Sequence, residues 1–145
     1  MNFSDIKSIL LVDDDIVSNL FNKLFIAGLN LDIEVDEALN GQEALNLLIE
    51  RENPNRASLL APCLLILDIN MPVMNGWEFL EQYDKLIPES VKDEIVIVML
   101  TISEEQDDMI KAMNNPNIRE FVKKPLSEKA FKKLIKKYFN REQVL

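Results

Sequence analysis

The chain of 145 residues contains no histidine, and cysteine occurs once, at Cys63. The lack of histidine excludes histidine metal ligands, Ser-His and Cys-His nucleophilic systems, and a phosphohistidine on this chain. Any metal must therefore be held by oxygen ligands, which favours Mg²⁺, Ca²⁺ or Mn²⁺. A single cysteine cannot form an internal disulfide, which fits a reducing cytoplasm, and its position in an apolar run predicts a buried, inert thiol.

Long apolar runs are also absent. The run IVIVML at residues 95–100 is far shorter than a membrane-spanning segment, so we expect no membrane association. No basic segment precedes the first apolar run, which predicts no signal peptide and a cytoplasmic protein. The length is that of one domain, and we expect a single domain over residues 1–145 with its core at about residues 6–140.

The net charge of −9 is unevenly distributed. Residues 119–145 carry a balance of +6, whereas residues 1–118 carry a balance of −15. An acidic body argues against general nucleic-acid binding, so nucleic acid is disfavoured as a partner. Five lysines near the C-terminus are interpreted as the solvated face of a helix: Lys129, Lys132, Lys133, Lys136 and Lys137.

Apolar and amphipathic segments alternate along the chain. Short apolar or alternating runs predict strands at residues 8–12, 31–38, 63–67, 95–100 and 117–122. Helical spacing predicts helices at residues 16–28, 40–50, 77–87, 103–113 and 127–139. This alternation of strands and helices predicts an α/β fold, a doubly wound, flavodoxin-like (βα)5 sheet of parallel strands in the order 2-1-3-4-5.

Apolar residues recur at helical spacing within these helices, and residues 51–62 form an irregular connection. The first helix, which we expect to stop at Gly28, carries Val17, Leu20, Phe21, Leu24 and Phe25 at this spacing. In the second helix, Ala44, Leu45, Leu48 and Ile49 lie on one face. We expect core packing in the last helix from Phe131, Leu134, Ile135 and Tyr138. The part of the connection at 53–62 is an insertion to which the sequence assigns no role.

Four strand ends carry groups suited to phosphate or metal chemistry. They are Asp13, Asp14 and Asp15; Asp68; Thr101; and Lys123, Lys124 and Pro125. Taken singly, each fits a helix cap, a turn or a surface loop. In a sheet of this order, however, strands 1 and 3 are neighbours at the point where ligands bind, so Asp13, Asp14 and Asp68 should share one acidic pocket. Crowded carboxylates repel each other, and the cluster therefore predicts a cation, with Mg²⁺ favoured.

Two further groups complete a set suited to phosphoryl transfer. Lys124 supplies a mobile positive charge that can pair with a carboxylate or a phosphate. Thr101 supplies a hydroxyl that can donate to a phosphoryl oxygen. With a carboxylate nucleophile and Mg²⁺, these groups predict phosphoryl transfer onto Asp68.

The motifs VDDD, DINMPVMNG, LT and KKP, in this order, resemble the receiver domain of two-component response regulators, of the stand-alone, chemotaxis-regulator-like kind. The resemblance covers essentially the whole chain. It implies that Asp68 is the phospho-acceptor and that Asp13, Asp14, Asp68 and the main-chain carbonyl of Asn70 hold Mg²⁺. It also implies that Lys124 contacts the phosphoryl group and that the Lys124–Pro125 peptide bond is cis.

The resemblance further implies a signalling switch that catalyses only its own phosphorylation and dephosphorylation. The phosphoryl donor would be a sensor histidine kinase or a histidine phosphotransfer protein, and the output a downstream protein target. Thr101 would move toward the phosphoryl group and Phe121 would rotate, which changes the surface formed by residues 103–113, 117–122 and 127–139. A phosphorylation-dependent homodimer is left open.

Other interpretations remain. A haloacid-dehalogenase-like phosphohydrolase also uses a strand-end aspartate, but it needs a second aspartate where this chain has Asn70. A receiver-shaped interaction module that no longer takes phosphate is argued against by the intact set of acidic, hydroxyl and lysine residues. A P-loop is excluded because its glycine-lysine motif is absent.

Two positions near the site have their own hypotheses. Ile102 is larger than the small residue often found after this threonine in the family, and we hypothesise that it narrows access to Asp68. Trp77 is expected to pack at the start of the third helix.

Overall fold

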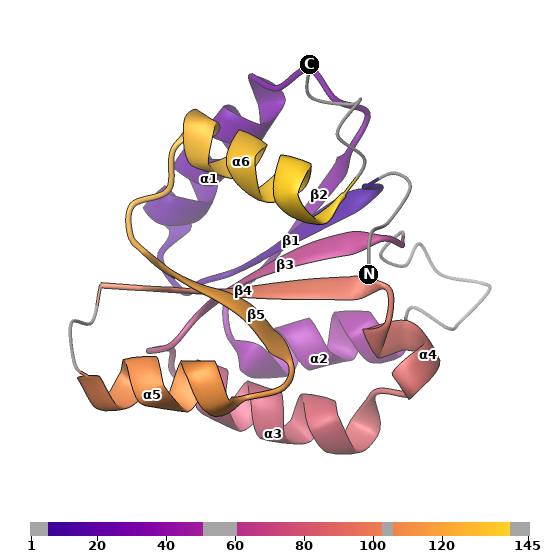
Figure 1. Cartoon of the computed structure of the whole chain (residues 1–145), viewed down its shortest axis with the longest axis vertical. Helices are drawn as coiled ribbons and strands as arrows, with labels where there is room; N and C mark the ends of the chain where they lie inside the picture. The colour runs from indigo at the N-terminus through magenta and orange to yellow at the C-terminus, as the bar shows by residue number, and fades with distance from the viewer. Residues whose placement is uncertain (1–5, 51–60, 103–105, 140–145) are drawn as a thin grey trace.

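A computed structural model describes residues 6–50, 61–102 and 106–139, and the following account is of these residues. Five parallel strands form one sheet in the order β2-β1-β3-β4-β5 (Figure 1). Their bounds are β1 Ser8–Val12, β2 Glu34–Ala38, β3 Cys63–Asp68, β4 Ile95–Thr101 and β5 Ile118–Lys123. The predicted fold class and strand order are therefore confirmed.

Helices cover both faces of the sheet. Figure 1 shows α1 (Ile16–Ala27) and α6 (Glu128–Tyr138) on one face. On the other face lie α2 (Gly41–Glu50), α3 (Gly76–Leu86) and α5 (Gln106–Asn114). The described residues form a sixth helix that the sequence analysis missed, the single turn α4 (Glu89–Lys92) before β4. The prediction of five helices was wrong here because four residues are too few to establish a helical period.

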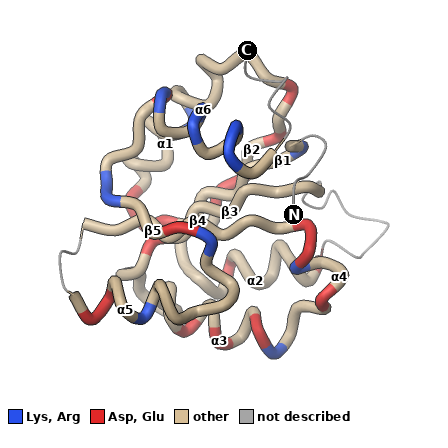
Figure 2. The backbone as a smooth tube through the Cα atoms, in the orientation of Figure 1, with Lys and Arg blue, Asp and Glu red and all other residues tan. Residues whose placement is uncertain are grey.

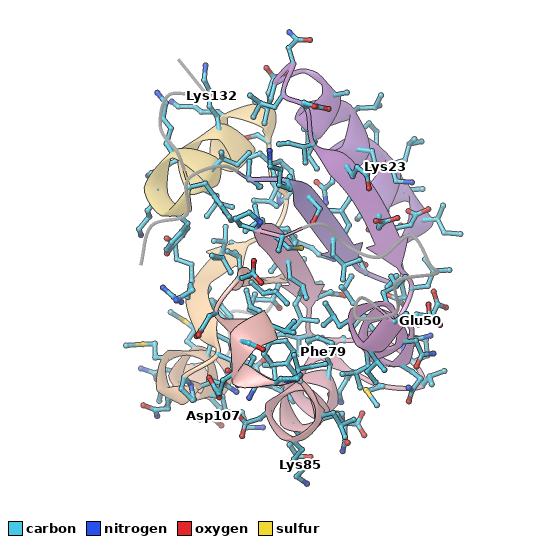
Figure 3. All side chains as sticks on the ribbon, turned by 90° about the vertical axis from the view of Figure 1, so that its right-hand side faces the viewer. Lys23, Glu50, Phe79, Lys85, Asp107 and Lys132 are labelled. Carbon is cyan, nitrogen blue, oxygen red and sulfur yellow. The ribbon has the colours of Figure 1, made fainter. Side chains whose placement is uncertain are left out.

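The sheet separates two apolar cores. Along β3, Cys63, Leu65 and Leu67 pack toward α2, α3 and α5, whereas Leu64 and Ile66 pack toward α1 and α6. This alternation explains the continuous apolar run, since a strand buried on both faces needs apolar residues at every position. Figure 3 shows Phe79 of α3 on the side facing the sheet, and Lys85 of the same helix pointing into solvent. The predicted burial of Cys63 is confirmed.

The helix at α1 is confirmed, but most of its apolar residues face solvent. Asn19, Asn22 and Ile26 are the buried residues of this helix. The apolar residues with more than half of their surface exposed are Ile16, Val17, Leu20, Phe21 and Leu24. We refer to these five residues as the α1 apolar face. An apolar stripe at helical spacing usually faces the core, so this helix departs from the usual orientation.

Smaller differences concern element bounds and packing. Strand β2 begins at Glu34 rather than at residue 31, because its pairing with β1 starts opposite Ser8. Ile49 is half-exposed, whereas the other three apolar residues of its predicted face are buried. The last helix packs as expected through Phe131, Leu134 and Ile135, with Tyr138 only partly buried. Most of the predicted insertion, residues 53–60, lies outside the described residues.

Candidate functional site

Three carboxylates meet at the carboxyl edge of the sheet. Val12 and Leu67 are paired in the β1–β3 ladder, so the residues that follow them, Asp13 and Asp68, come side by side. Asp13, Asp14 and Asp68 each offer an oxygen within 4.8 Å of the others. Asp13 and Asp68 are buried, and Asp14 is exposed. The structure thus brings the predicted acidic residues together.

Backbone groups organise the end of β1. The N–H of Asp13 donates to the carbonyl of Ala38 at 3.0 Å, and its Oδ1 accepts from the N–H of Asp15 at 2.9 Å. Asp15 caps α1 by accepting from the N–H of Val17 at 3.0 Å and from the hydroxyl of Ser18 at 2.9 Å. The hydrogen bond from Ser18 lowers the pKa of the Asp15 carboxyl. Asp15 is therefore a helix cap, distinct from the acidic cluster.

Asp68 is the most electrostatically perturbed group of the site. Burial, together with the nearby charge of Asp13, raises the pKa of Asp68 to about 6. Lys124 and the N–H of Ile69 oppose this rise. A buried carboxylate with a neighbouring carboxylate is stabilised by a cation, so the electrostatics of the site favour a positive ligand.

Lys124 reaches the cluster from the end of β5. Its ammonium donates to Asp13 Oδ2 at 2.7 Å and lies 3.5 Å from Asp68 Oδ1. Burial alone would lower the pKa of Lys124, but its hydrogen bond to Asp13 and the two carboxylate charges raise it above the usual value. The predicted cis Lys124–Pro125 bond is present, and the Lys124 N–H donates to the carbonyl of Thr101 at 2.9 Å.

Thr101 ends the neighbouring strand. Thr101 is buried, and Leu100, the residue before it, is paired with Asp68 in the β3–β4 ladder. Lys123 is exposed at the end of β5, beside the inward-reaching Lys124. The predicted hydroxyl and lysine therefore lie at the same edge of the sheet as the acidic cluster.

The loop between β3 and α3 is held close to the site. The N–H of Gly76 donates to the carbonyl of Ile69 at 2.8 Å, and a Cβ at Gly76 would lie 2.5 Å from the main-chain oxygen of Asp68. Only glycine allows this approach. The carbonyl of Met74 accepts from the N–H of Gly41 at 2.9 Å. Asn70 lies in this loop and is exposed.

The turn at the tip of this loop contains one residue, Val73, in a strained conformation. Val73 has φ 67°, and the N–H of Met74 donates to the carbonyl of Pro72 at 2.7 Å. This bond closes a three-residue turn around a β-branched residue with positive φ, which is a rare conformation. Valine is not a residue type that favours positive φ, so the sequence could not indicate this conformation.

The other predicted positions lie around the site. Phe121 of β5 is partly buried and lines a cavity of about 250 Å³ together with Ala112 and Met113 of α5. Trp77 packs against the core as expected, and the Lys111 ammonium lies 5.2 Å from its ring.

A larger cavity of about 580 Å³ adjoins the site on the α1 side. Ile102, which is 74% exposed, lines it together with Lys124. Its remaining apolar lining comes from Phe21, Phe25, Leu100, Pro125 and Leu126.

Comparison with known proteins identifies the family. The model of the response regulator receiver domain matches residues 9–136. The chain is 33% identical over 113 residues to the nitrate/nitrite response regulator protein NarL of Escherichia coli, covering 78% of this chain and 46% of NarL. Over 94 residues it is 36% identical to the protein-glutamate methylesterase/protein-glutamine glutaminase of Treponema denticola, covering 65% of this chain and 22% of that protein.

Among solved structures, a two-component response regulator from Cytophaga hutchinsonii matches with a TM-score of 0.77 and 29% identity, covering 92% of this chain and 96% of that one. The chain belongs to the response regulator receiver domain family, as the sequence motifs indicated. Its acidic pocket is typical of phosphorylation and Mg²⁺ binding in this family. The chain spans less than half the length of the two curated relatives described above. Within the described ranges, every helix is too short or too polar to cross a bilayer.

Proposed function

We propose that this protein is a phospho-accepting switch of a two-component system, in which Asp68 takes a phosphoryl group from a phosphohistidine of a sensor histidine kinase or a histidine phosphotransfer protein. The observation that carries the proposal is the clustering of Asp13, Asp14 and Asp68 with the Lys124 ammonium at one edge of the sheet. The protein would act in the cytoplasm and would catalyse only its own phosphorylation and dephosphorylation.

In the phosphoryl transfer, a carboxylate oxygen of Asp68 forms the new bond to phosphorus. The bond between phosphorus and the donor's imidazole nitrogen breaks, and its electron pair stays on that nitrogen. Since the pKa of Asp68 is about 6, most molecules carry the ionised, nucleophilic carboxylate at neutral pH. Lys124 then pairs with a phosphoryl oxygen, and the Thr101 hydroxyl donates to another.

The residues present fit Mg²⁺. Three carboxylate oxygens within 4.8 Å of one another form the hard, anionic donor set that this ion prefers. We assign Asp13, Asp14, Asp68 and the main-chain carbonyl of Asn70 as the groups that hold it. When bound, the ion supplies positive charge that offsets the repulsion between these carboxylates and an incoming phosphoryl group.

The α1 apolar face supports a protein as the phosphoryl donor. Soluble domains rarely expose five large apolar residues on one helix unless a partner covers them. Phe21 belongs to this face and also lines the cavity that contains Lys124, so the face is continuous with the phosphorylation site. We infer that a helix of the histidine-bearing donor packs here while its histidine reaches Asp68.

The output surface is assigned to α5, β5 and α6. Phe121 of β5 is partly buried, and its ring would rotate into the space that Thr101 leaves when it moves toward the phosphoryl group. Figure 2 shows acidic residues at the start of α5 and basic residues along α6. Figure 3 places Asp107 and Lys132 on these two helices. A downstream protein, or a second phosphorylated copy of the chain, would recognise this surface.

The test is intact mass after incubation with acetyl phosphate and Mg²⁺, with Asp68→Asn and EDTA as controls. A phosphoryl adduct that requires both Asp68 and the metal supports the proposal. Multiple turnovers that release phosphate from small esters would instead favour a dehalogenase-like phosphohydrolase.

If no adduct forms, Ile102→Ala distinguishes a restricted site from an inactive one. An adduct seen only in this variant would support the gating hypothesis for Ile102. Its absence in both proteins, with a histidine-phosphorylated donor also failing, would identify a receiver that no longer takes phosphate.

A further inference from the structure

Asn19 of α1 is a buried polar residue that the phosphoryl transfer described above does not use. Its side chain is fully buried. Its Nδ2 donates to the main-chain oxygen of Asp13 at 2.9 Å, whereas its Oδ1 has no hydrogen-bond partner among the described residues. An unsatisfied buried acceptor destabilises the folded state. A leucine, which has the same number of side-chain heavy atoms, would bring no unsatisfied oxygen into the core, so packing alone does not explain an asparagine here.

The carbonyl of Asp13 needs a donor because the β-sheet ends at this point. Strand β2 ends at Ala38, whose carbonyl accepts the Asp13 N–H. In the described part of the chain, no backbone N–H donates to the Asp13 carbonyl. The Asn19 amide replaces the missing donor. Its own backbone N–H donates to the carbonyl of Asp15 at 3.1 Å, so Asn19 ties the first turn of α1 to the end of β1.

This hydrogen bond acts on a peptide unit that joins two of the three clustered aspartates. The Asp13 carbonyl belongs to the planar peptide between Asp13 and Asp14. Fixing the rotation of that plane restricts the backbone rotations on its two sides, from which the Asp13 and Asp14 side chains leave. Asp13 is also held through its N–H and its carboxylate, whereas the Asp14 side chain is exposed.

We propose that Asn19 is a positioning residue that orients the Asp13 and Asp14 carboxylates relative to Asp68 for binding a divalent cation. The proposal rests on the metal site of the proposed function. Asn19 does not touch the cation; it acts through the peptide plane, which explains why an amide with an unsatisfied oxygen is kept in an apolar environment.

The test is Mn²⁺ binding to the full chain, followed by the electron paramagnetic resonance signal of free Mn²⁺. Asn19→Leu keeps the number of side-chain heavy atoms and removes the donor. We expect the Kd of this variant for Mn²⁺ to rise by about 10-fold, which is the lower end of the loss in affinity when a residue that orients metal ligands is replaced. The matched control is Asn22→Leu, which replaces the other buried asparagine of the same helix. Its Kd should stay within about twofold of the original value.

A second readout separates positioning from general damage. In Asn19→Leu, the Mg²⁺ concentration that half-saturates phosphorylation by acetyl phosphate should rise as the Kd does, while the rate at saturating Mg²⁺ stays within about threefold. If Asn19→Leu does not fold, Asn19→Ala replaces it with the same expectation. An unchanged Kd in the folded variant, or an equal loss in Asn22→Leu, overturns the proposal. Failure of the unmodified chain to bind Mn²⁺ would overturn the metal site itself.

Discussion

Replacing Asp68 by asparagine should stabilise the protein, although it removes the proposed phosphorylation site. The ionised carboxylate is disfavoured in the folded state, because burial and the charge of Asp13 raise its pKa from 3.8 to about 6. A shift of about two pKa units corresponds to about 3 kcal/mol at neutral pH. Asparagine resembles the neutral acid in shape and carries no charge. We therefore expect Asp68→Asn to raise the free energy of unfolding by about 2–3 kcal/mol at pH 7.

The sign of the pH dependence follows from the raised pKa. Above pH 6 the folded protein carries the unfavourable charge, and below about pH 3 the carboxyl is mostly neutral in both the folded and unfolded states. The stability difference between variant and original chain should therefore be full at pH 7 and nearly absent at about pH 3.

Urea unfolding followed by circular dichroism, in EDTA, measures this difference at both pH values. Adding Mg²⁺ at pH 7 should reduce the stability difference between the two proteins, because the ion stabilises the charged site of the original chain more than that of the variant. If the variant is less stable, or if the stability difference does not change with pH, Asp68 is not a buried carboxylate whose charge destabilises the fold.

Three further predictions concern the same edge of the sheet. Lys124→Met removes a positive charge that lowers the pKa of Asp68. The pKa of Asp68 should therefore rise above about 6, as measured by a carbon-13 NMR titration of its carboxyl. An unchanged pKa would contradict the pairing of Lys124 with Asp68. Gly76→Ala places a methyl group against the Asp68 main chain and should cost roughly 1–3 kcal/mol in urea unfolding, whereas no loss would refute the close approach. Val73→Gly relieves a positive φ and should stabilise the chain by about 1 kcal/mol, and a destabilised variant would show that the turn is not strained.

Local sequence determined the fold class. The apolar runs of β1, β3 and β4 are buried along their whole length, and such runs are typical of central parallel strands. Their alternation with helical segments leaves few possible topologies, because crossovers between parallel strands are right-handed. The same order predicted that Asp13 and Asp68 would be neighbours, and the β1–β3 register places them so.

Sequence was less informative about the surroundings of the site. The short helix α4 has too few residues to show a periodicity, and nothing in the sequence indicates the positive φ of Val73. Sequence spacing also could not predict that Lys124 lies closer to Asp13 than to Asp68, because Lys124 and Asp13 are 111 positions apart in the chain. Such distances depend on how the strand ends stagger when the whole sheet is assembled.

The orientation of α1 shows most clearly what the sequence decides and what tertiary packing decides. Its sequence carries apolar residues at helical spacing, which indicates a helix and favours the apolar side as the buried one. In the folded protein the sheet and α6 bury Asn19, Asn22 and Ile26, and the α1 apolar face is left in solvent. The sequence by itself therefore indicated the five strands and the five longer helices, and it predicted the residues of the acidic cluster. Only tertiary packing decided that an asparagine is buried against the Asp13 carbonyl, because that contact needs the end of β1 and the first turns of α1 to meet in space.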